Sequence, residues 1–301
     1  MLRTVTVGLD GSAESRAAAE WAAREARLRG LSLKVVHVRE PDPEPVAQAP
    51  LVGVETSQDW TENLPWEATT GIALRHPGVD VIGELLTGRP AVLLAKVADA
   101  AELLVLGSRA LGAVGGFLLG SVGLRVVAHA RRPVVLVRAG EQAPDEHLMD
   151  PAGVPSAAAP FRPVVLGIDT EKPDGTLLGF AFDSAVRRTA PLRVVHGWSL
   201  PPTYDHAPAV GYDPRATFAR HMAAELSEVL RPWRQKYPDV VVIEESRHRA
   251  PATAIVEAAR DASLVVVGRR NRHGSLGSRI GHVTHAALQH AVAPVAVVPH
   301  D

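Results

Sequence analysis

The chain contains no cysteine, so disulfide bonds, thiolate nucleophiles and cysteine-ligated metal clusters are excluded. Aromatic residues make up only 4% of its 301 residues, which gives little support to a stacking platform for single-stranded nucleic acid. Neither sign of charge dominates, because 32 Lys and Arg residues stand against 33 Asp and Glu residues. This balance argues against a general electrostatic attraction to nucleic acid or to anionic lipid.

Long apolar runs are also missing, and none approaches the ~20 residues that span a bilayer. The first residues run directly into a strand-like segment, without the charged start, apolar stretch and cleavage site of a secretory leader. We therefore expect a cytoplasmic protein that has no membrane partner. What the chain does contain is 46% hydrophobic residues, which is enough for a sizeable core and, at this length, for about two domains.

An internal repeat divides the chain into two halves. Four short segments return in the same order, two of them after 159 residues and two after 161: VTVGLD at 5–10, LKVVH at 33–37, LLVLG at 103–107 and PVVLV at 133–137. Similarity among valine-rich strands does not explain why the Asp, His, Gly and Pro positions are shared as well, so we infer a duplicated domain. The proline-rich segment between the copies is typical of a linker. We predict a first domain at 1–139, a linker at 140–160 and a second domain at 161–301.

Short apolar segments alternate with amphipathic helical patterns in both copies. The predicted strands are near-continuous runs of Val, Leu and Ile and cover 4–9, 31–38, 79–86, 103–106, 133–138, 164–168, 192–196, 240–244, 264–267 and 295–298. The predicted helices cover 13–29, 61–75, 89–101, 121–130, 175–189, 213–237, 252–260 and 282–289. This alternation predicts an α/β fold with two tandem open parallel five-stranded sheets, each covered by helices on both faces.

In such sheets ligands bind beyond the carboxyl ends of the strands, where the strand order reverses. Asp10 follows the first predicted strand, and the glycine-rich segment 107–120 follows the fourth and leads into a helix at Ser121. Taken alone, Asp10 is more often a helix cap and the loop a simple connection. Together they indicate a nucleotide pocket. In it the carboxylate accepts hydrogen bonds from the ribose hydroxyls, and backbone N–H groups bind the phosphate. The lysine of a P-loop, the GxGxxG pattern, the HExxH pattern and the GxSxG nucleophile elbow are all absent.

These residues resemble those of a tandem universal stress protein. The ATP-binding pattern of that family is glycine, two residues, glycine, nine residues, glycine, and then serine or threonine. Here the four positions are taken by Gly107, Ala110, Gly120 and Ser121, so alanine replaces the second glycine. In the second copy Gly268, Asn271 and Gly281 keep the spacing, but His282 replaces the hydroxyl residue. The second copy is therefore expected to bind nucleotide differently or to serve as a structural partner.

The resemblance implies a Rossmann-like fold of the adenine nucleotide alpha hydrolase type, with ATP as the ligand, with or without magnesium. The residues that it implies for nucleotide binding are Leu9, Asp10, Val38, Gly107, Ala110, Gly120, Ser121, Val122, Asp169, Gly268, Asn271 and Gly281. It also implies that domains pair through their fifth strands, here 133–138 and 294–298 within one chain, and it leaves a homodimer open.

The leading functional hypothesis is an ATP-binding stress-response regulator without efficient turnover, because no catalytic base, lysine or metal-ligand set accompanies the predicted phosphate cradle. Two alternatives stay open at this point. One is a slow ATPase or adenylate-transferring enzyme, since folds of this kind host such chemistry, although fold analogy is a weak warrant. The other is an interaction scaffold that binds no nucleotide, since both loops depart from the family pattern.

Overall fold

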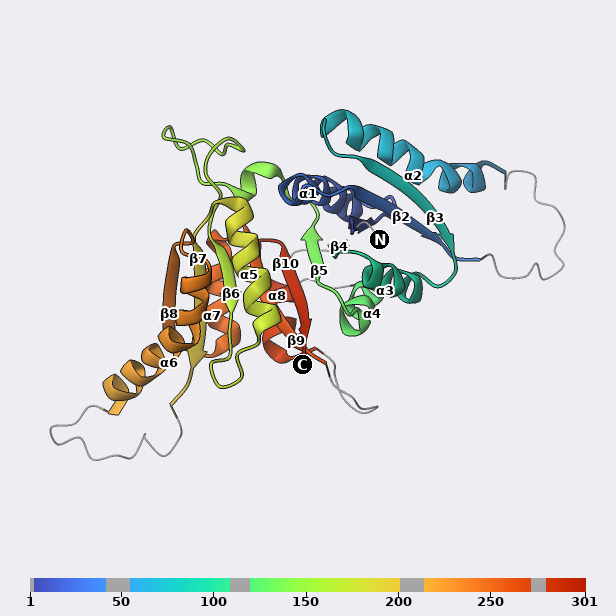
Figure 1. Cartoon of the computed structure of the whole chain (residues 1–301). Coiled ribbons are helices and arrows are strands. Elements are labelled where there is room, and N and C mark those ends of the chain that lie inside the picture. Colours follow the sequence, from blue (N-terminus) through green and yellow to red (C-terminus); the bar gives the residue numbers. More distant parts are fainter. Residues whose placement is uncertain (1–2, 42–54, 109–119, 201–213, 272–279) are drawn as a thin grey trace. The chain divides into compact units, whose positions relative to one another are not determined.

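The computed structural model describes residues 3–41, 55–108, 120–200, 214–271 and 280–301, without the side chains of residues 55–64 and 214. The chain divides into two compact units, unit 1 (Met1–Gln142) and unit 2 (Ala143–Asp301), and Figure 1 traces both along the sequence. Each unit has the predicted α/β architecture, in which parallel strands alternate with helices.

The five strands of unit 1 all run parallel to one another. They are β1 (Val5–Gly8), β2 (Leu33–Arg39), β3 (Val81–Thr87), β4 (Leu103–Ser108) and β5 (Val134–Arg138). Their order across the sheet is β3-β2-β1-β4-β5, so the direction of strand addition reverses between β1 and β4. That reversal marks the expected ligand-binding edge.

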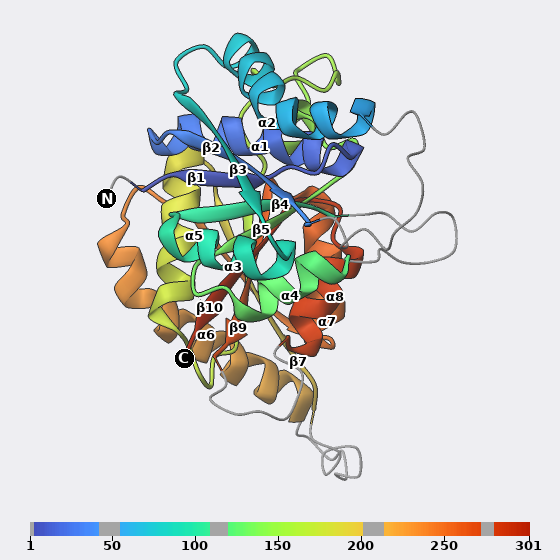
Figure 2. The same ribbon diagram turned by 90° about the vertical axis from the view of Figure 1, so that its right-hand side faces the viewer.

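The helices of unit 1 are α1 (Ala13–Arg29), α2 (Glu55–Arg75), α3 (Pro90–Ala100) and α4 (Ser121–His129). Helices α1 and α2 contact each other over one face of the strands, and α3 and α4 contact each other over the opposite face. Figure 2 shows α3 and α4 side by side in front of the strands. This placement follows from right-handed crossovers, because the first two connections move across the sheet in one direction and the last two in the other.

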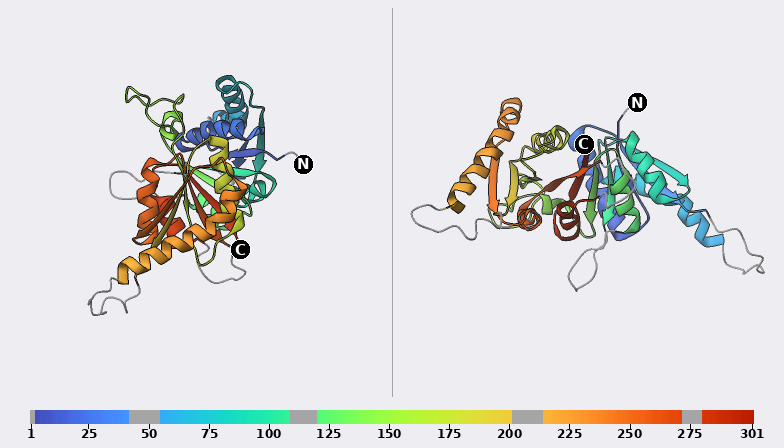
Figure 3. Two further views of the ribbon diagram at one scale, coloured as in Figure 1. Left: turned by 60° about the vertical axis from the view of Figure 1, so that its left-hand side comes forward. Right: turned by 90° about the horizontal axis from the view of Figure 1, so that it is seen from below.

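Unit 2 repeats this arrangement with the strand order β10-β9-β6-β7-β8, and its strands are also parallel. The strands are β6 (Val164–Gly167), β7 (Leu192–Trp198), β8 (Val242–His248), β9 (Leu264–Arg270) and β10 (Val295–His300). The main helices are α5 (Gly175–Arg188), α6 (Pro214–Lys236), α7 (Pro251–Ala258) and α8 (His282–His290). In the right-hand view of Figure 3, α5 and α6 lie on one side of these strands, with α7 and α8 on the other.

Local sequence explains why helix α1 has the predicted bounds. Ser12 caps its start, since the Ser12 side chain accepts the N–H of Ser15 at 3.1 Å, and Gly30 ends it in the left-handed conformation at φ 63°. Both caps are residue types that favour these positions. The buried face of α1 is mostly alanine around Trp21, which allows the helix to pack closely on β1 and β4.

The edge strand β8 departs from the expected apolar pattern. The prediction ended it at Glu244, whereas it continues to His248 through four polar residues. The difference has an electrostatic cause: Arg234 lies 2.6 Å from Glu244, and Arg193 lies 3.5 Å from Glu245. An edge strand has a neighbouring strand on one side only and is less buried than a central strand. Ion pairs along it can therefore replace apolar burial.

The segment predicted as a linker has local structure. It includes the 3-10 helix η1 (Ala143–Glu146), and its backbone forms isolated bridges between His147 and Phe161 and between Met149 and Pro155. The rings of His147 and Phe161 lie 4.0 Å apart, and the guanidinium of Arg162 donates to the His147 carbonyl at 2.8 Å. Proline-rich composition therefore marks a region without long helices or strands, but these contacts order it within unit 2. The domain boundaries stay predictions.

Candidate functional site

A cavity of about 280 Å³ opens in unit 1 at the carboxyl ends of β1 and β4, where the strand order reverses. The residues that line it are Gly8, Leu9, Asp10, Ser12, Glu14, Ser15, Val36, Val38, Pro90, Leu94, Leu106, Gly107, Gly120, Ser121, Val122 and Gly123. All the residues predicted for the first copy line this one cavity except Ala110, which lies outside the described residues. The structure thus brings together groups that are more than 100 residues apart in the sequence.

Asp10 supports the start of α1 without being its cap. One of its carboxylate oxygens accepts the N–H of Ser12 at 3.0 Å and the hydroxyl of Ser12 at 2.5 Å, and Ser12 in turn caps the helix. The carboxylate is exposed at the cavity edge and is held by this turn. The alternative in which Asp10 is only a cap is therefore replaced by a more specific arrangement: a serine caps the helix, and the aspartate stays at the cavity.

Gly107 is required by close packing between β4 and α1. A Cβ at this position would lie 2.6 Å from the backbone carbon of Glu14 and 2.7 Å from the nitrogen of Ser15. No side chain fits between these backbones without moving one of them. The glycine therefore lets the start of α1 approach the end of β4, and this contact shapes the wall of the cavity.

The start of α4 supplies donors to the same cavity. Gly120 is its N-cap and makes no side-chain hydrogen bond to the first turn, and Ser121, Val122 and Gly123 line the cavity. The first N–H groups of a helix have no partner within the helix and carry a partial positive charge. This arrangement suits an anion such as phosphate.

Sequence reasoning missed a role for His37, although the repeat contained the pattern for it. Its Nδ1 lies 2.7 Å from the carbonyl of Leu9, and the equivalent His196 places Nδ1 3.2 Å from the carbonyl of Ile168. In both units a buried imidazole thus holds the chain just after the first strand. The shared final histidine of the LKVVH and LRVVH segments was the available indication.

A second cavity, of about 770 Å³, occupies the corresponding edge of unit 2. It is lined by Gly167, Ile168, Asp169, Thr170, Glu171, Lys172, Asp174, Leu177, Val195, His196, Gly197, Trp198, Ser199, Phe218, His221, Met222, Glu225, Pro251, Ile255, Val267, Gly268, Arg270, His282, Val283, Thr284 and His300. Asp169 and Gly268 are among these residues, as predicted, whereas Asn271 and Gly281 are not. The side chain of Asn271 instead donates to Asp301 at 3.0 Å, and Gly281 is the N-cap of α8.

The connection after the first strand differs between the two copies. Helix α1 begins three residues after Asp10, whereas α5 begins six residues after Asp169. A Cβ on Gly268 would meet the imidazole of His300 at 2.5 Å, whereas its counterpart Gly107 meets the backbone of α1. The carboxylate of Asp169 also pairs with Arg270 at 2.8 Å. The longer connection therefore places other side chains at the strand ends.

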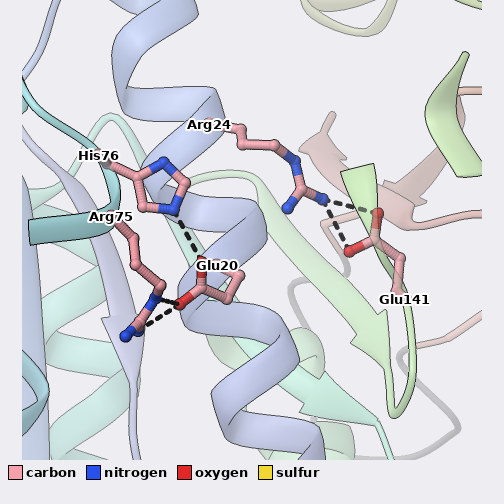
Figure 4. A network of polar contacts seen from close by, with 5 residues as sticks. All are labelled: Glu20, Arg24, Arg75, His76 and Glu141. Carbon is pink, nitrogen blue, oxygen red and sulfur yellow. Dashed lines mark hydrogen bonds and ion pairs between the residues drawn. The ribbon is translucent and has the colours of Figure 1, made fainter. Parts of the chain in front are cut away.

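A polar network ties α1 to the end of α2 in unit 1 (Figure 4). The carboxylate of Glu20 accepts hydrogen bonds from Arg75 at 2.9 Å and contacts His76 at 2.8 Å. Burial alone raises the pKa of Glu20, but hydrogen bonds and charge from Arg75 and His76 outweigh burial, so this pKa lies below its ordinary value. On the same helix, Arg24 binds both oxygens of Glu141, at 2.7 and 2.8 Å.

The part of the chain that the structure describes lacks two further features. No group of three or more His, Cys, Asp or Glu side chains there has an arrangement that could hold a metal ion. No helix among the same residues is both long and apolar enough to cross a bilayer.

An open parallel sheet with a ligand-sized cavity at its reversal point defines each unit as a Rossmann-like α/β domain. The model of the universal stress protein family matches both halves of the chain, at residues 1–138 and 160–299. The chain belongs to the universal stress protein family, and the two matches confirm the duplication.

Relatives of similar length support this assignment. A universal stress protein of Mycobacterium bovis is 33% identical over 99% of this chain and 96% of its own length. A universal stress protein of Mycobacterium tuberculosis is 34% identical over 97% of this chain and 96% of its own length. The crystal structure of a universal stress protein from Archaeoglobus fulgidus shares the fold, with a TM-score of 0.66 at 16% identity over 99% of this chain and 98% of that one. A universal stress protein solved in complex with cAMP is 26% identical over 46% of this chain and 98% of its own, with a TM-score of 0.36.

Proposed function

We propose that unit 1 is an ATP-binding regulatory domain, and that the cavity between the ends of β1 and β4 is its nucleotide site. The observation that carries the proposal is the convergence of Asp10, Gly107 and the start of α4 on one cavity. These groups supply a hydrogen-bond acceptor, a close backbone approach and a set of N–H donors. A nucleotide needs all three.

Each part of ATP can be matched to residues that line the cavity. The exposed carboxylate of Asp10 is suited to accept hydrogen bonds from the ribose hydroxyls. The N–H groups that open α4 beside Ser121 suit the phosphates, because the helix dipole favours negative charge there. Leu9, Val36 and Val38 form an apolar wall beside Asp10 for the adenine ring.

The site supports binding better than turnover. Its described lining has two ionisable side chains, Asp10 and Glu14, and both are acidic. Efficient phosphoryl transfer also uses cationic groups that neutralise charge developing on the phosphates. Where magnesium accompanies the nucleotide, the Glu14 carboxylate would hold it together with the phosphates, and the ion would supply positive charge beside them.

Calorimetry on nucleotide-stripped protein tests this proposal. We expect ATP to bind, and we expect Asp10→Asn to weaken it about tenfold or more, since a hydrogen bond to a charged group contributes ~1.5–3 kcal/mol. Asp183→Asn is the matched control, because Asp183 pairs with Arg187 on the surface of α5 in unit 2 and should leave binding unchanged. Titrations with ADP, AMP and cAMP then show how much each phosphate group contributes to the affinity. Absence of heat with all four nucleotides at millimolar concentration would refute nucleotide binding.

For unit 2 we retain Asp169, Gly268, Asn271 and Gly281 as the predicted equivalents, with a weaker case for nucleotide. Asp169 is engaged by Arg270, and two of the four residues do not line the cavity. We also propose that β5 and β10 pair within one chain, since each is the last strand of its own unit, each is apolar, and an apolar strand edge without a partner promotes association. Val135→Lys should then lower the sedimentation coefficient of the monomer or change the number of chains in the particle, both of which analytical ultracentrifugation measures.

A further inference from the structure

The cavity of unit 2 has an aromatic wall that the predicted nucleotide residues do not explain. Phe218, Met222 and Glu225 line it from α6 at spacings of four and three residues, so they form one stripe along the helix. Trp198, the last residue of β7, adds an aromatic ring, and its centroid lies 5.3 Å from that of Phe218. The indole N–H of Trp198 donates to Ser246 at 3.0 Å, so its polar edge already has a partner.

A carboxylate is fixed at the end of this wall. One oxygen of Glu225 lies 3.2 Å from the imidazole of His221, and the other lies 3.5 Å from the hydroxyl of Thr170. Thr170 in turn contacts His196 at 3.5 Å, and His196 is anchored to the carbonyl of Ile168. This chain of contacts orients Glu225 from the strand side, while the exposed His221 can move aside for a ligand.

The surroundings favour a cation over an anion next to Glu225. Of the two cationic side chains that line the cavity, Arg270 is paired with Asp169 at 2.8 Å, and Lys172 lies on the connection between β6 and α5. A phosphate beside Glu225 would meet like charge, whereas an ammonium group would gain a charge-assisted hydrogen bond. The apolar ring or chain of such a ligand would then lie along Phe218 and Met222.

We propose that the cavity of unit 2 binds a small aromatic amine, with its ring on the Trp198–Phe218–Met222 wall and its ammonium group on Glu225. A volume of about 770 Å³ lies in the usual range for a pocket of this kind, ~300–1,000 Å³. The proposal is independent of nucleotide binding in unit 1, because no residue is shared between the two cavities. The two units would then bind ligands of opposite charge.

Calorimetry with two matched probes tests the charge preference. Tyramine carries an aromatic ring and an ammonium group, and 3-(4-hydroxyphenyl)propionate carries the same ring with a carboxylate. We expect the full-length protein to bind one tyramine per chain, and to bind the carboxylate probe at least tenfold more weakly. Equal affinity for the two probes, or no heat with tyramine at millimolar concentration, would overturn the proposal.

Variants locate the binding. Glu225→Gln should weaken tyramine at least tenfold, whereas Glu228→Gln on the same helix, where Glu228 pairs with Arg231 at the surface, should leave it unchanged. Phe218→Leu keeps the carboxylate and reduces the aromatic wall, so it should weaken tyramine several-fold even if the Glu225 variant does not fold. Asp10→Asn should have no effect on tyramine. Loss of tyramine binding in that variant would assign the amine to unit 1 and refute this proposal.

Discussion

The two units join their first two helices by different chemistry. In unit 1, Glu20 on α1 binds Arg75 and His76 at the end of α2. At the equivalent position, 159 residues later, unit 2 has Gly179, and a Cβ there would lie 3.5 Å from the ring of Trp233 on α6. The rings of Phe182 and Trp233 lie 5.7 Å apart, and those of Phe182 and Tyr237 lie 5.1 Å apart.

This difference shows that the duplicated fold constrains the position of the helix joint but not its chemistry. A half-exposed ion-pair network depends on pH and salt and contributes little per pair. An aromatic stack built on the fully buried Phe182 contributes more, through buried area and ring contact, and depends less on pH and salt. The two joints should therefore respond differently to the same perturbations.

The largest expected effect is at Phe182, which is fully buried in α5. Phe182→Ala should destabilise unit 2 by ~3–5 kcal/mol, because it removes a core ring and leaves a cavity. Hydrogen exchange measured by mass spectrometry should show faster exchange in unit 2 peptides, with little change in the peptides of α1 and α2. Val186→Ala, at a half-exposed position of the same helix, is the control and should change exchange only slightly. Uniformly faster exchange in both units would mean that they unfold together, and the comparison between joints would fail.

The next largest loss of stability is expected at Gly107, where two backbones pack closely. Gly107→Ala would place a Cβ 2.6 Å from the backbone of Glu14, so α1 or β4 must shift at a cost of ~1–3 kcal/mol. The cavity of unit 1 should change shape with it, and ATP binding should weaken. Gly268→Ala meets the imidazole of His300, a side chain that can rotate, and should cost less. Thermal unfolding by circular dichroism compares the two variants, and equal losses would contradict the proposed difference between the strand ends.

Gly120→Ala adds a side chain at the same cavity without a packing conflict. Nothing described lies within 4 Å of a Cβ at Gly120, and its φ of −55° suits an L-residue. The thermal stability of the Gly120→Ala variant, measured by circular dichroism, should therefore match that of the wild type.

Much of this site could be predicted from sequence because its parts are local. The end of a strand, a serine cap and a glycine-rich connection are each visible in a few residues, and the repeat displayed Asp10 and its counterpart together. Helix α1 matched its predicted bounds for the same reason, since Ser12 and Gly30 mark its ends. The ATP-binding role of these residues stays a prediction.

What sequence could not supply depends on contacts between distant residues. The stack of Phe182, Trp233 and Tyr237 joins positions about 50 apart. The wall of Trp198 and Phe218 forms only when the ring of Phe218 on α6 meets that of Trp198 at the end of β7. Strand β8 was predicted too short because Glu244 and Glu245 look like the end of a strand until Arg234 and Arg193 are seen beside them. In each case the partner that stabilises the residue lies on another element.

The smallest effect is expected at the ion-pair joint of unit 1, and its pH dependence identifies it. Because the pKa of Glu20 is lowered in the folded state, its charged form stabilises the fold above the ordinary pKa of a carboxyl group, and this contribution disappears as the pH falls through the folded-state pKa. Glu20→Gln should therefore cost about 0.5–1 kcal/mol near neutral pH, the size usual for partly exposed pairs, and nothing once the carboxyl is protonated. Glu67→Gln, at an exposed position of α2, should cost nothing at either pH. Urea unfolding at both pH values checks this, and a Glu20→Gln loss that persists in acid would show that packing rather than charge holds this joint.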